Sequence, residues 1–363
     1  MERRKPTKEA RRLHGLLGAQ QQWANPVRTA VCDEKARPEY TECAAHEYRD
    51  VPEVLEAKVK QLAHLLKQSK LCVAYTGAGL SVASGLDDYA TKSKESLSSR
   101  PHVSAERGSG FLATPNKGHK VLTRLHKQGL LKKVVNQNHD GLLQKAGFPQ
   151  HAINEIHGGW FDPSNPGGNQ LRDDLFEELL ALETSTDLCL ALGTSLSGLN
   201  ADRLAKTPAK KYPRNGFGLV IVTLQETQLD DICTLRIFAP LDEVLGLLAA
   251  ELELPELSDM ELANDHDDFT LPYDPRTGGH SSTKTCTLKL HEGAKIKVLR
   301  GNFAGCSGVV GQKNEQGHYN VQIFAPVEGM PGVVITNDHL LGSWWLAEAE
   351  QGLITFLPVV PDS

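Results

Sequence analysis

Short runs of consecutive apolar residues alternate with helical patterns between residues 50 and 253, and this alternation constrains the fold more than any other feature. The runs CLALG (189–193) and LVIV (219–222) contain no polar side chain. A strand of this kind has to be covered on both faces, as the strands of a parallel sheet are. Strands that alternate with helices indicate a doubly wound parallel α/β sheet.

The first predicted helix begins at Asp50, which can cap it, with Pro52 in its first turn and Glu53 where a capping box needs it. Its buried face is predicted from a four-three-four spacing: Leu55, Val59, Leu62 and Leu66. Further helices are predicted over 121–131, 171–183 and 241–252. The predicted strands are 71–75, 132–137, 152–158, 187–194, 218–224 and 234–239.

Composition divides the rest of the chain. Residues 1–49 mix charge, proline and glutamine without periodicity, which predicts a largely flexible arm. Residues 254–285 are rich in Asp, Glu, Pro, Gly and Ser and are predicted to be a linker. Residues 286–358 contain short alternating segments with glycine turns every eight to twelve residues, which predicts a small β-barrel.

Charge and cysteine content narrow the class of protein. The net charge of −6 gives no overall argument for nucleic acid, and no run approaches the roughly 18 apolar residues of a membrane span. We therefore expect an intracellular protein without a membrane partner. Six basic side chains within residues 1–12 form a nuclear-import candidate or, equally, a solvated tail, so the nucleus is expected and the cytoplasm stays open.

The seven cysteines include no C-x-x-C pair, which predicts reduced thiols, with Cys72 and Cys189 inside strands. Cys32, Cys43 and His46 could in principle hold zinc, but their spacing matches no common site. No metal site is therefore predicted.

A glycine-rich turn, within AYTGAGLSVASGLDDYA (74–90), directly follows the first predicted strand. In doubly wound sheets, ligands bind outside the carboxyl ends of the strands. Gly77, Ala78 and Gly79 would let a pyrophosphate approach backbone N–H groups at a helix N-terminus. A plain tight turn fits the stretch equally well, because Val82 stands where the G-x-G-x-x-G pattern needs a small residue.

Polar residues follow three other predicted strands. Gln137, Asn138 and Asp140 end one, His157 precedes a glycine after another, and a Gly-Thr-Ser turn (193–195) ends a third. For each group alone, loop capping is the more common role. Together they predict one crevice that contains a histidine.

In order and approximate spacing, G-A-G-L-S, Q-N-H-D-G-L, I-H-G, G-T-S-L and V-I-V-T-L-Q-E-T resemble the sirtuins, the NAD-dependent protein deacylases. The resemblance covers about residues 50–253, and its tail looks most like the class with chromatin-associated nuclear members. It implies a Rossmann-like sheet, NAD as cofactor and an acylated protein lysine as substrate. The acyl group would pass to ADP-ribose with release of nicotinamide.

The resemblance also implies roles for individual residues. His157 would be the general base that takes a ribose hydroxyl proton, a task that suits imidazole because it titrates near neutrality. Gln137 and Asn138 would act with it in catalysis. The implied cofactor-binding residues are Gly77, Ala78, Gly79, Ser81, Asp88, Tyr89, Gln137, Asn138, Asp140, Gly193, Thr194 and Ser195.

The sequence departs from the sirtuin pattern in several places. Ala90 stands where the family's D-F-R element has arginine, Thr223 where it has asparagine, and Leu143 where a histidine is frequent. No cysteine lies between His157 and Cys189, so the four-cysteine zinc ribbon is predicted to be absent and zinc is not expected. Peptide capture by strand addition would need a substitute from residues 160–170 or from the C-terminal barrel.

The C-terminal segment resembles a KOW motif, an SH3-like barrel element that binds RNA or protein. Gly301, Gly305 and Gly308 would form its turns, and its predicted core residues are Val298, Val309 and Val310. A role as a stabilising or spacing module is a further alternative. Trp344 and Trp345 are expected either in the core or in an exposed docking patch.

Two other functions stay open at this point. The same crevice could perform mono-ADP-ribosyl transfer or NAD hydrolysis, since the usual substrate segment is missing. Alternatively, the chain could be a non-catalytic scaffold that binds NAD while its C-terminal barrel binds RNA or protein, as the residues at 90 and 223 suggest.

Overall fold

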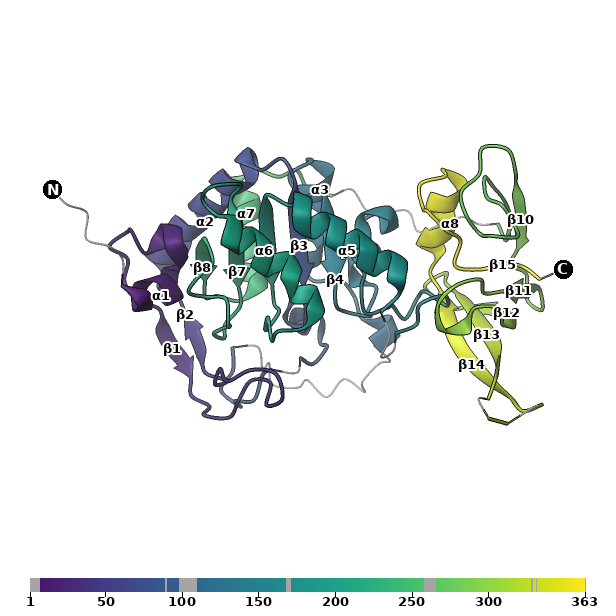
Figure 1. Ribbon diagram of the computed structural model, residues 1–363, viewed down its shortest axis with the longest axis horizontal. Coiled ribbons are helices and arrows are strands. Elements are labelled where there is room, and N and C mark those ends of the chain that lie inside the picture. Colours follow the sequence, from purple (N-terminus) through teal and green to yellow (C-terminus); the bar gives the residue numbers. More distant parts are fainter. Residues whose placement is uncertain are drawn as a thin grey trace. The chain divides into compact units, whose positions relative to one another are not determined.

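The computed structural model describes residues 7–88, 90–97, 110–167, 171–257, 266–327, 329–330 and 332–362. The chain divides into two compact units (Figure 1). Unit 1 comprises Met1–Gln137 and Asp173–Leu257, and unit 2 comprises Asn138–Arg172 and Ser258–Ser363. Residues 138–172 therefore group with the C-terminal residues, whereas the sequence placed them in one domain with the rest of 50–253.

Unit 1 is built on a parallel sheet. Within this unit the spatial order of the strands is β4 (Lys133–Asn136), β3 (Cys72–Thr76), β6 (Leu188–Leu192), β7 (Gly218–Val222) and β8 (Leu235–Ile237). Every residue of β3, β6 and β7 is buried, as their unbroken apolar sequences predict. The doubly wound parallel α/β fold is thus confirmed.

Two groups of helices cover this sheet. Helices α2 (Pro52–Gln68), α3 (Lys117–Lys127) and α7 (Leu241–Glu251) pack together, and α5 (Asp173–Ser185) lies beside α6 (Arg203–Lys211) in Figure 1. Helix α6 was not predicted, because its sequence RLAKTPAKK is largely polar and contains Pro208. The predicted apolar face of α2 is buried, with Leu66 fully inaccessible.

Asp50 does not cap α2. The N-cap is Val51, and it makes no side-chain capping bond. Instead, the Asp50 carboxylate accepts hydrogen bonds from Lys58 Nζ at 2.6 Å and from the Phe238 N–H at 2.9 Å. Because Lys58 is fully buried, its ammonium group needs this counter-ion, and that need prevails over the capping geometry.

The described part of residues 1–49 is built into unit 1, in contrast to the flexible arm that the sequence predicts. It contains α1 (Lys8–Gly18), β1 (Val27–Ala30) and β2 (Glu47–Arg49), and the two strands are antiparallel. The backbone N–H groups of Leu16 and Leu17 donate to the carbonyls of Cys233 and Thr234 at 2.8 and 2.9 Å. Such pairing with distant backbone leaves no local sequence pattern.

Unit 2 contains a five-stranded antiparallel sheet and a two-stranded one. The larger sheet has the order β14 (Val334–Leu341), β13 (Tyr319–Pro326), β12 (Ser307–Lys313), β11 (Lys295–Lys297) and β15 (Val360–Pro361). The smaller sheet pairs β9 (Asp268–Leu271) with β10 (Cys286–Lys289). Unit 2 also contains α4 (Leu142–Lys145), β5 (Ile153–Glu155) and α8 (Ser343–Glu350).

The core of unit 2 begins earlier than predicted. Phe269, Leu271 and Tyr273 are buried in it, although the sequence assigned residues 254–285 to a linker. Their burial alternates along β9, but acidic neighbours obscure this pattern. Val298 and Val310 lie in the core as predicted.

Val309 is only half-buried, because side chains of a strand alternate between its faces and Val310 occupies the inner one. Trp345 is a core residue, and Trp344 packs against the core. Within the described residues, no helix combines the length and apolarity that crossing a membrane requires.

All seven cysteines are free thiols, and Cys72 and Cys189 lie buried in strands as predicted. The described residues contain no group of three or more His, Cys, Asp and Glu side chains placed to bind a metal. His46 Nδ1 is close to the N–H of Cys32, at 3.1 Å, and so accepts a backbone hydrogen bond.

Candidate active site

The glycine turn of unit 1 follows β3 and leads into two short 3₁₀ turns, Ala78–Leu80 and Val82–Ser84, where the sequence predicted a helix. The N–H groups of Gly77 and Gly79 donate to the carbonyls of Leu192 and Gly193 at 3.1 and 3.0 Å. The N–H groups of Leu80 and Ser81 close the first 3₁₀ turn. These bonds use four of the five N–H groups from Gly77 to Ser81, and the fifth belongs to Ala78.

The glycines of this turn allow two loops of unit 1 to pack closely against each other. A Cβ atom on Gly77 would lie 2.8 Å from the Gly193 carbonyl oxygen, and one on Gly79 would lie 2.8 Å from the Gly193 Cα. Gly193 has a φ of +61°, and its own Cβ would lie 2.6 Å from the Leu80 nitrogen. The loops after β3 and β6 therefore touch backbone to backbone, which larger residues would prevent.

Hydroxyl and amide groups gather where β3, β4 and β6 end. The Gln137 side-chain amide donates to Thr194 Oγ1 at 2.9 Å, and Ser195 Oγ lies 2.5 Å from Ser197 Oγ. The side chain of Ser81 is buried. The structure thus brings together the predicted residues of unit 1 that follow these three strands, as parallel strands with a common edge require.

Asp88 organises its own loop. Its Oδ1 accepts the N–H groups of Ala90 and Thr91 at 3.1 and 2.7 Å, and its Oδ2 accepts the Thr91 hydroxyl at 3.0 Å. This arrangement fixes the turn that follows Asp88. Tyr89, which the sequence assigned to cofactor binding, lies outside the described residues.

In unit 2, His157 stands between β5 and a tight glycine turn. The Gly158 N–H donates to the Glu155 carbonyl at 2.8 Å, and the Gly159 N–H donates to the Asn165 carbonyl at 2.9 Å. Gly158 has a φ of +88°, and a Cβ there would clash with the Gly167 backbone. A sharp turn closed by residues 165–167 thus presents the half-buried His157.

His139 is a residue whose role the sequence did not reveal. Its Nδ1 lies 2.9 Å from the Gly158 carbonyl oxygen, and its own carbonyl accepts the Trp160 N–H at 2.8 Å. These two contacts tie the Asn138–Asp140 segment to the His157 turn. His139 and Gly158 lie 19 residues apart, so their contact leaves no periodic pattern in the sequence.

Asp140 is buried, and its Oδ1 accepts the Leu142 N–H at 3.0 Å at the start of α4. Asn138 is half-buried. Leu143, which replaces a histidine of the sirtuin pattern, is a core residue with 1% of its surface exposed. The unit 2 residues predicted for the site therefore lie in one segment. Among them, Asp140 also stabilises the start of α4 through its hydrogen bond with the Leu142 N–H.

Glu155 is a second residue whose role the sequence did not reveal. Burial raises the pKa of its carboxyl to about 7, and the nearby charges of Asp162 and Asp140 act in the same direction. Hydrogen bonds from the Gln144 and Gln150 side chains oppose that rise in pKa. The available signal was an acid inside the apolar run INEI, two residues before His157.

C-terminal residues hold this segment within unit 2. The Phe161 ring lies 4.9 Å from the His318 ring and 5.0 Å from the Trp344 ring, between centroids. Both oxygens of Glu348 accept backbone N–H groups, from Gln150 at 2.5 Å and His151 at 2.9 Å. The segment that carries His157 is thus held partly by a residue 198 positions away from Gln150.

Residues 90–164 match the family described as "Sir2 family". Over this range the chain is similar to Sir2-family proteins. The sirtuin resemblance predicted from the sequence is confirmed.

Relatives of the chain occur in animals, plants and archaea. The chain is 31% identical over 265 residues to the human "NAD-dependent protein deacetylase sirtuin-7", covering 58% of this chain and 64% of that protein. It is 28% identical over 253 residues to "NAD-dependent protein deacetylase SRT1" of Arabidopsis thaliana, covering 57% and 52%. A third relative is the "NAD-dependent protein deacetylase" of Sulfolobus acidocaldarius, 28% identical over 234 residues, covering 50% and 90%. The chain thus spans less than two thirds of the human and Arabidopsis relatives.

Proposed function

We propose that this chain is an NAD-dependent protein-lysine deacylase with His157 as its general base. The observation that carries the proposal is the set of polar groups after four strands: hydroxyls and amides after β3, β4 and β6, and a half-buried histidine in the glycine turn after β5. Relatives of the chain bear the name NAD-dependent protein deacetylase.

The residues of unit 1 fit a dinucleotide by their chemistry. The Thr194 and Ser195 hydroxyls and the Gln137 amide can bond ribose hydroxyls and a carboxamide. Ala78, Gly79 and Ser81 would lie against the pyrophosphate, with Gly77 and Gly193 keeping side chains out of the way. When bound, NAD would supply the ribosyl carbon that accepts the acyl oxygen of the substrate lysine as its bond to nicotinamide breaks.

The residues of unit 2 would perform the proton transfer. His157 would accept the ribose hydroxyl proton through its neutral imidazole, since histidine changes charge near neutral pH. Asn138 and Asp140 would orient the same ribose, and the bond of Asp140 to the Leu142 N–H holds its carboxylate in one place. No step among these needs a metal ion.

A second activity is compatible with this chain, because the segment that would pair with a substrate peptide is missing. Residues 158–167 are described, and they form turns with no strand that could pair with a substrate backbone. Transfer of ADP-ribose to a protein side chain, or to water, needs the same NAD site without that pairing. The relatives' names favour deacylation.

The decisive assay follows nicotinamide release from NAD with and without an acetyl-lysine peptide. The proposal predicts release that depends on the peptide, appearance of acetyl-ADP-ribose, and loss of both in His157→Ala. Release without the peptide, leaving ADP-ribose on protein or in solution, would favour the second activity. Binding of NAD with no release across a panel of acyl peptides would instead support a non-catalytic scaffold.

We further propose that the antiparallel sheet of unit 2 is an SH3-like barrel of the KOW type, which binds a protein or RNA partner. Its support is the glycine-punctuated sequence and the antiparallel order of β11–β14. A nuclear location is proposed from the basic residues near the N-terminus, of which Arg12 pairs with Glu226 at 2.8 Å. Imaging of the tagged chain, and pull-down with and without ribonuclease, test these two points.

A further inference from the structure

The loop after Asp88 is held in unit 1 by two side chains that lie outside it. The Gln225 side-chain amide donates to the Ala90 carbonyl at 2.8 Å. Glu47 holds the far end of the same loop, because its Oε1 accepts the Ser96 hydroxyl at 2.5 Å and its Oε2 accepts the Leu97 N–H at 3.0 Å. We name residues 90–97 the anchored loop.

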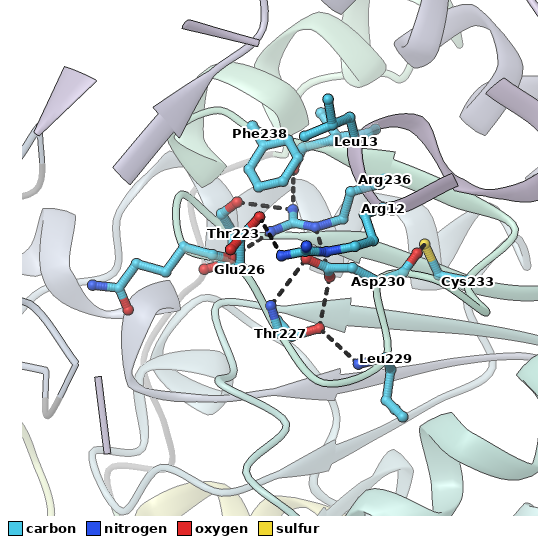
Figure 2. A network of polar contacts seen from close by, with 12 residues as sticks. Arg12, Leu13, Thr223, Glu226, Thr227, Leu229, Asp230, Cys233, Arg236 and Phe238 are labelled. Atoms are coloured by element: carbon cyan, nitrogen blue, oxygen red, sulfur yellow. Dashed lines mark hydrogen bonds and ion pairs between the residues drawn. The ribbon is translucent and has the colours of Figure 1, made fainter. Parts of the chain in front are cut away.

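Gln225 is itself fixed by a buried arginine. Figure 2 shows the Arg236 guanidinium at the centre of the loop that follows β7. It donates to the backbone carbonyls of Thr223 at 2.9 Å and of Gln225, and its Nε lies 2.8 Å from Asp230 Oδ1. Arg236 is fully buried, so these bonds are shielded from water.

Asp230 completes this network in Figure 2. Its carboxylate also accepts the N–H and hydroxyl of Thr227, at 3.0 and 2.7 Å. From the N-terminal segment, Arg12 pairs with Glu226 at 2.8 Å. These contacts hold the backbone on both sides of Gln225 in one conformation. They thereby fix the point from which the Gln225 side chain reaches the anchored loop.

Glu47 belongs to the same backbone framework. It forms an antiparallel bridge with Gln225, and the N–H of its neighbour Tyr48 donates to the Leu224 carbonyl at 2.9 Å. Only 1% of Glu47 is exposed, and a buried carboxylate is stable only when donors satisfy it. The donors of the anchored loop, Ser96 and Leu97, meet this need.

The anchored loop follows the glycine turn, which the proposed function places against the pyrophosphate, and Asp88, which the sirtuin resemblance assigns to cofactor binding. Position 90 offers no charged side chain for fixing this loop. We propose that Gln225 and Glu47 are positioning residues that hold the anchored loop from outside and thereby set the affinity of the domain for NAD. The part of this inference that concerns NAD rests on the proposed function.

Gln228 provides a matched control in the same loop. Its side-chain amide donates to the Tyr40 carbonyl at 2.9 Å, so it makes the same kind of bond to a different segment. Gln225→Glu and Gln228→Glu each replace one amide donor by a carboxylate of the same shape. A second test variant, Glu47→Gln, replaces one of the two acceptor oxygens that face Ser96 and Leu97.

The experiment measures two quantities on the full chain: amide hydrogen exchange of residues 90–97 without ligand, and NAD affinity by calorimetry. Gln225→Glu and Glu47→Gln should both accelerate exchange in the anchored loop and weaken NAD binding about three- to tenfold, the effect of one lost hydrogen bond. Gln228→Glu should change neither quantity. The KM for NAD should rise in the first two variants while kcat at saturating NAD stays within twofold.

Unchanged exchange of residues 90–97 in both test variants would overturn the positioning role. Equal weakening of NAD binding by Gln228→Glu would overturn it as well, because the effect would then be general. A wild-type chain that binds no NAD would refute the proposed function and the affinity claim with it. In that case the exchange data would still decide whether the two residues hold the loop.

Discussion

The glycine turn of unit 1 and the His157 turn of unit 2 are stabilised in different ways. The first depends on backbone packing, in which Gly77 and Gly79 meet Gly193 with no room for a Cβ atom. The second depends on side chains from distant residues, including Trp344 and Glu348. A turn held by backbone packing tolerates no added atoms, whereas one held by side chains fails when atoms are removed. Substitutions can therefore tell the two turns apart.

The largest expected effect concerns the loop after β7 in unit 1. Arg236→Met leaves the buried Asp230 carboxylate without its partner, which costs about 3–5 kcal/mol of unfolding free energy. Burial already raises the pKa of Asp230, and Arg236 counteracts that rise. Denaturant unfolding measures the loss. A double variant that also carries Asp230→Asn should lose less than the single variant, and a larger loss would contradict the explanation.

A comparable effect is expected in unit 2. Phe161→Ala removes a ring that is 2% exposed and should cost about 3–5 kcal/mol. It should also accelerate hydrogen exchange at residues 153–159, because the ring ties the His157 turn to His318 and Trp344. Phe269→Ala, a core change in β9, is the control. If both variants affected residues 153–159 equally, the specific role of Phe161 would be refuted.

An intermediate effect depends on pH. The pKa of Glu155 is about 7 in the folded chain, against an ordinary value of 4.5. The folded state therefore binds more protons than the unfolded state between these values. The stability due to protonated Glu155 is complete below about pH 4.5 and is lost as pH rises through about 7, by up to about 3 kcal/mol.

Glu155→Gln should remove this part of the pH dependence of unfolding. Thermal melts at several pH values between 4.5 and 8 test the point. A wild type and variant with parallel curves would show that Glu155 is not the group responsible.

The smallest effect is a difference between two glycine substitutions. Gly193→Ala lowers the free energy of unfolding for two reasons: alanine would have to adopt a φ of +61°, and its Cβ would lie 2.6 Å from the Leu80 nitrogen. Gly317→Ala has a φ of +78°, and its Cβ would meet no described atom within 4 Å. The first should therefore cost about 1–3 kcal/mol more than the second. Equal melting temperatures would show that the two loops of unit 1 separate at little cost.

Much of unit 1 can be predicted because its signals are local. The strands β3, β6 and β7 consist of consecutive apolar residues, and the buried face of α2 recurs at helical spacing. The polar residues at the strand ends follow from the same pattern, since parallel strands share one carboxyl edge. The local sequence pattern of this unit therefore predicts which of its polar residues lie at the same edge of the sheet.

The supports of the site could not be predicted in this way. Glu47 pairs with Gln225 across 178 positions, and Glu348 bonds Gln150 across 198. The first contact joins two backbones, and the second joins a backbone N–H group to a buried carboxylate. Neither contact leaves a periodic pattern in the sequence. Asp50 illustrates the conflict: its local pattern favours a helix cap, but the buried Lys58 takes its carboxylate. Tertiary charge pairing prevails there over local preference.

The central claim is that the glycine turn at 77–79 and the imidazole of His157 serve one and the same ribose-containing ligand. A crystal structure of the full chain with NAD and an acetyl-lysine peptide tests it most directly. The account predicts the pyrophosphate against Gly77–Ser81 and a His157 ring nitrogen within hydrogen-bond reach, about 2.6–3.2 Å, of a ribose hydroxyl. An NAD molecule bound on that turn with His157 turned away from every ribose oxygen would contradict it.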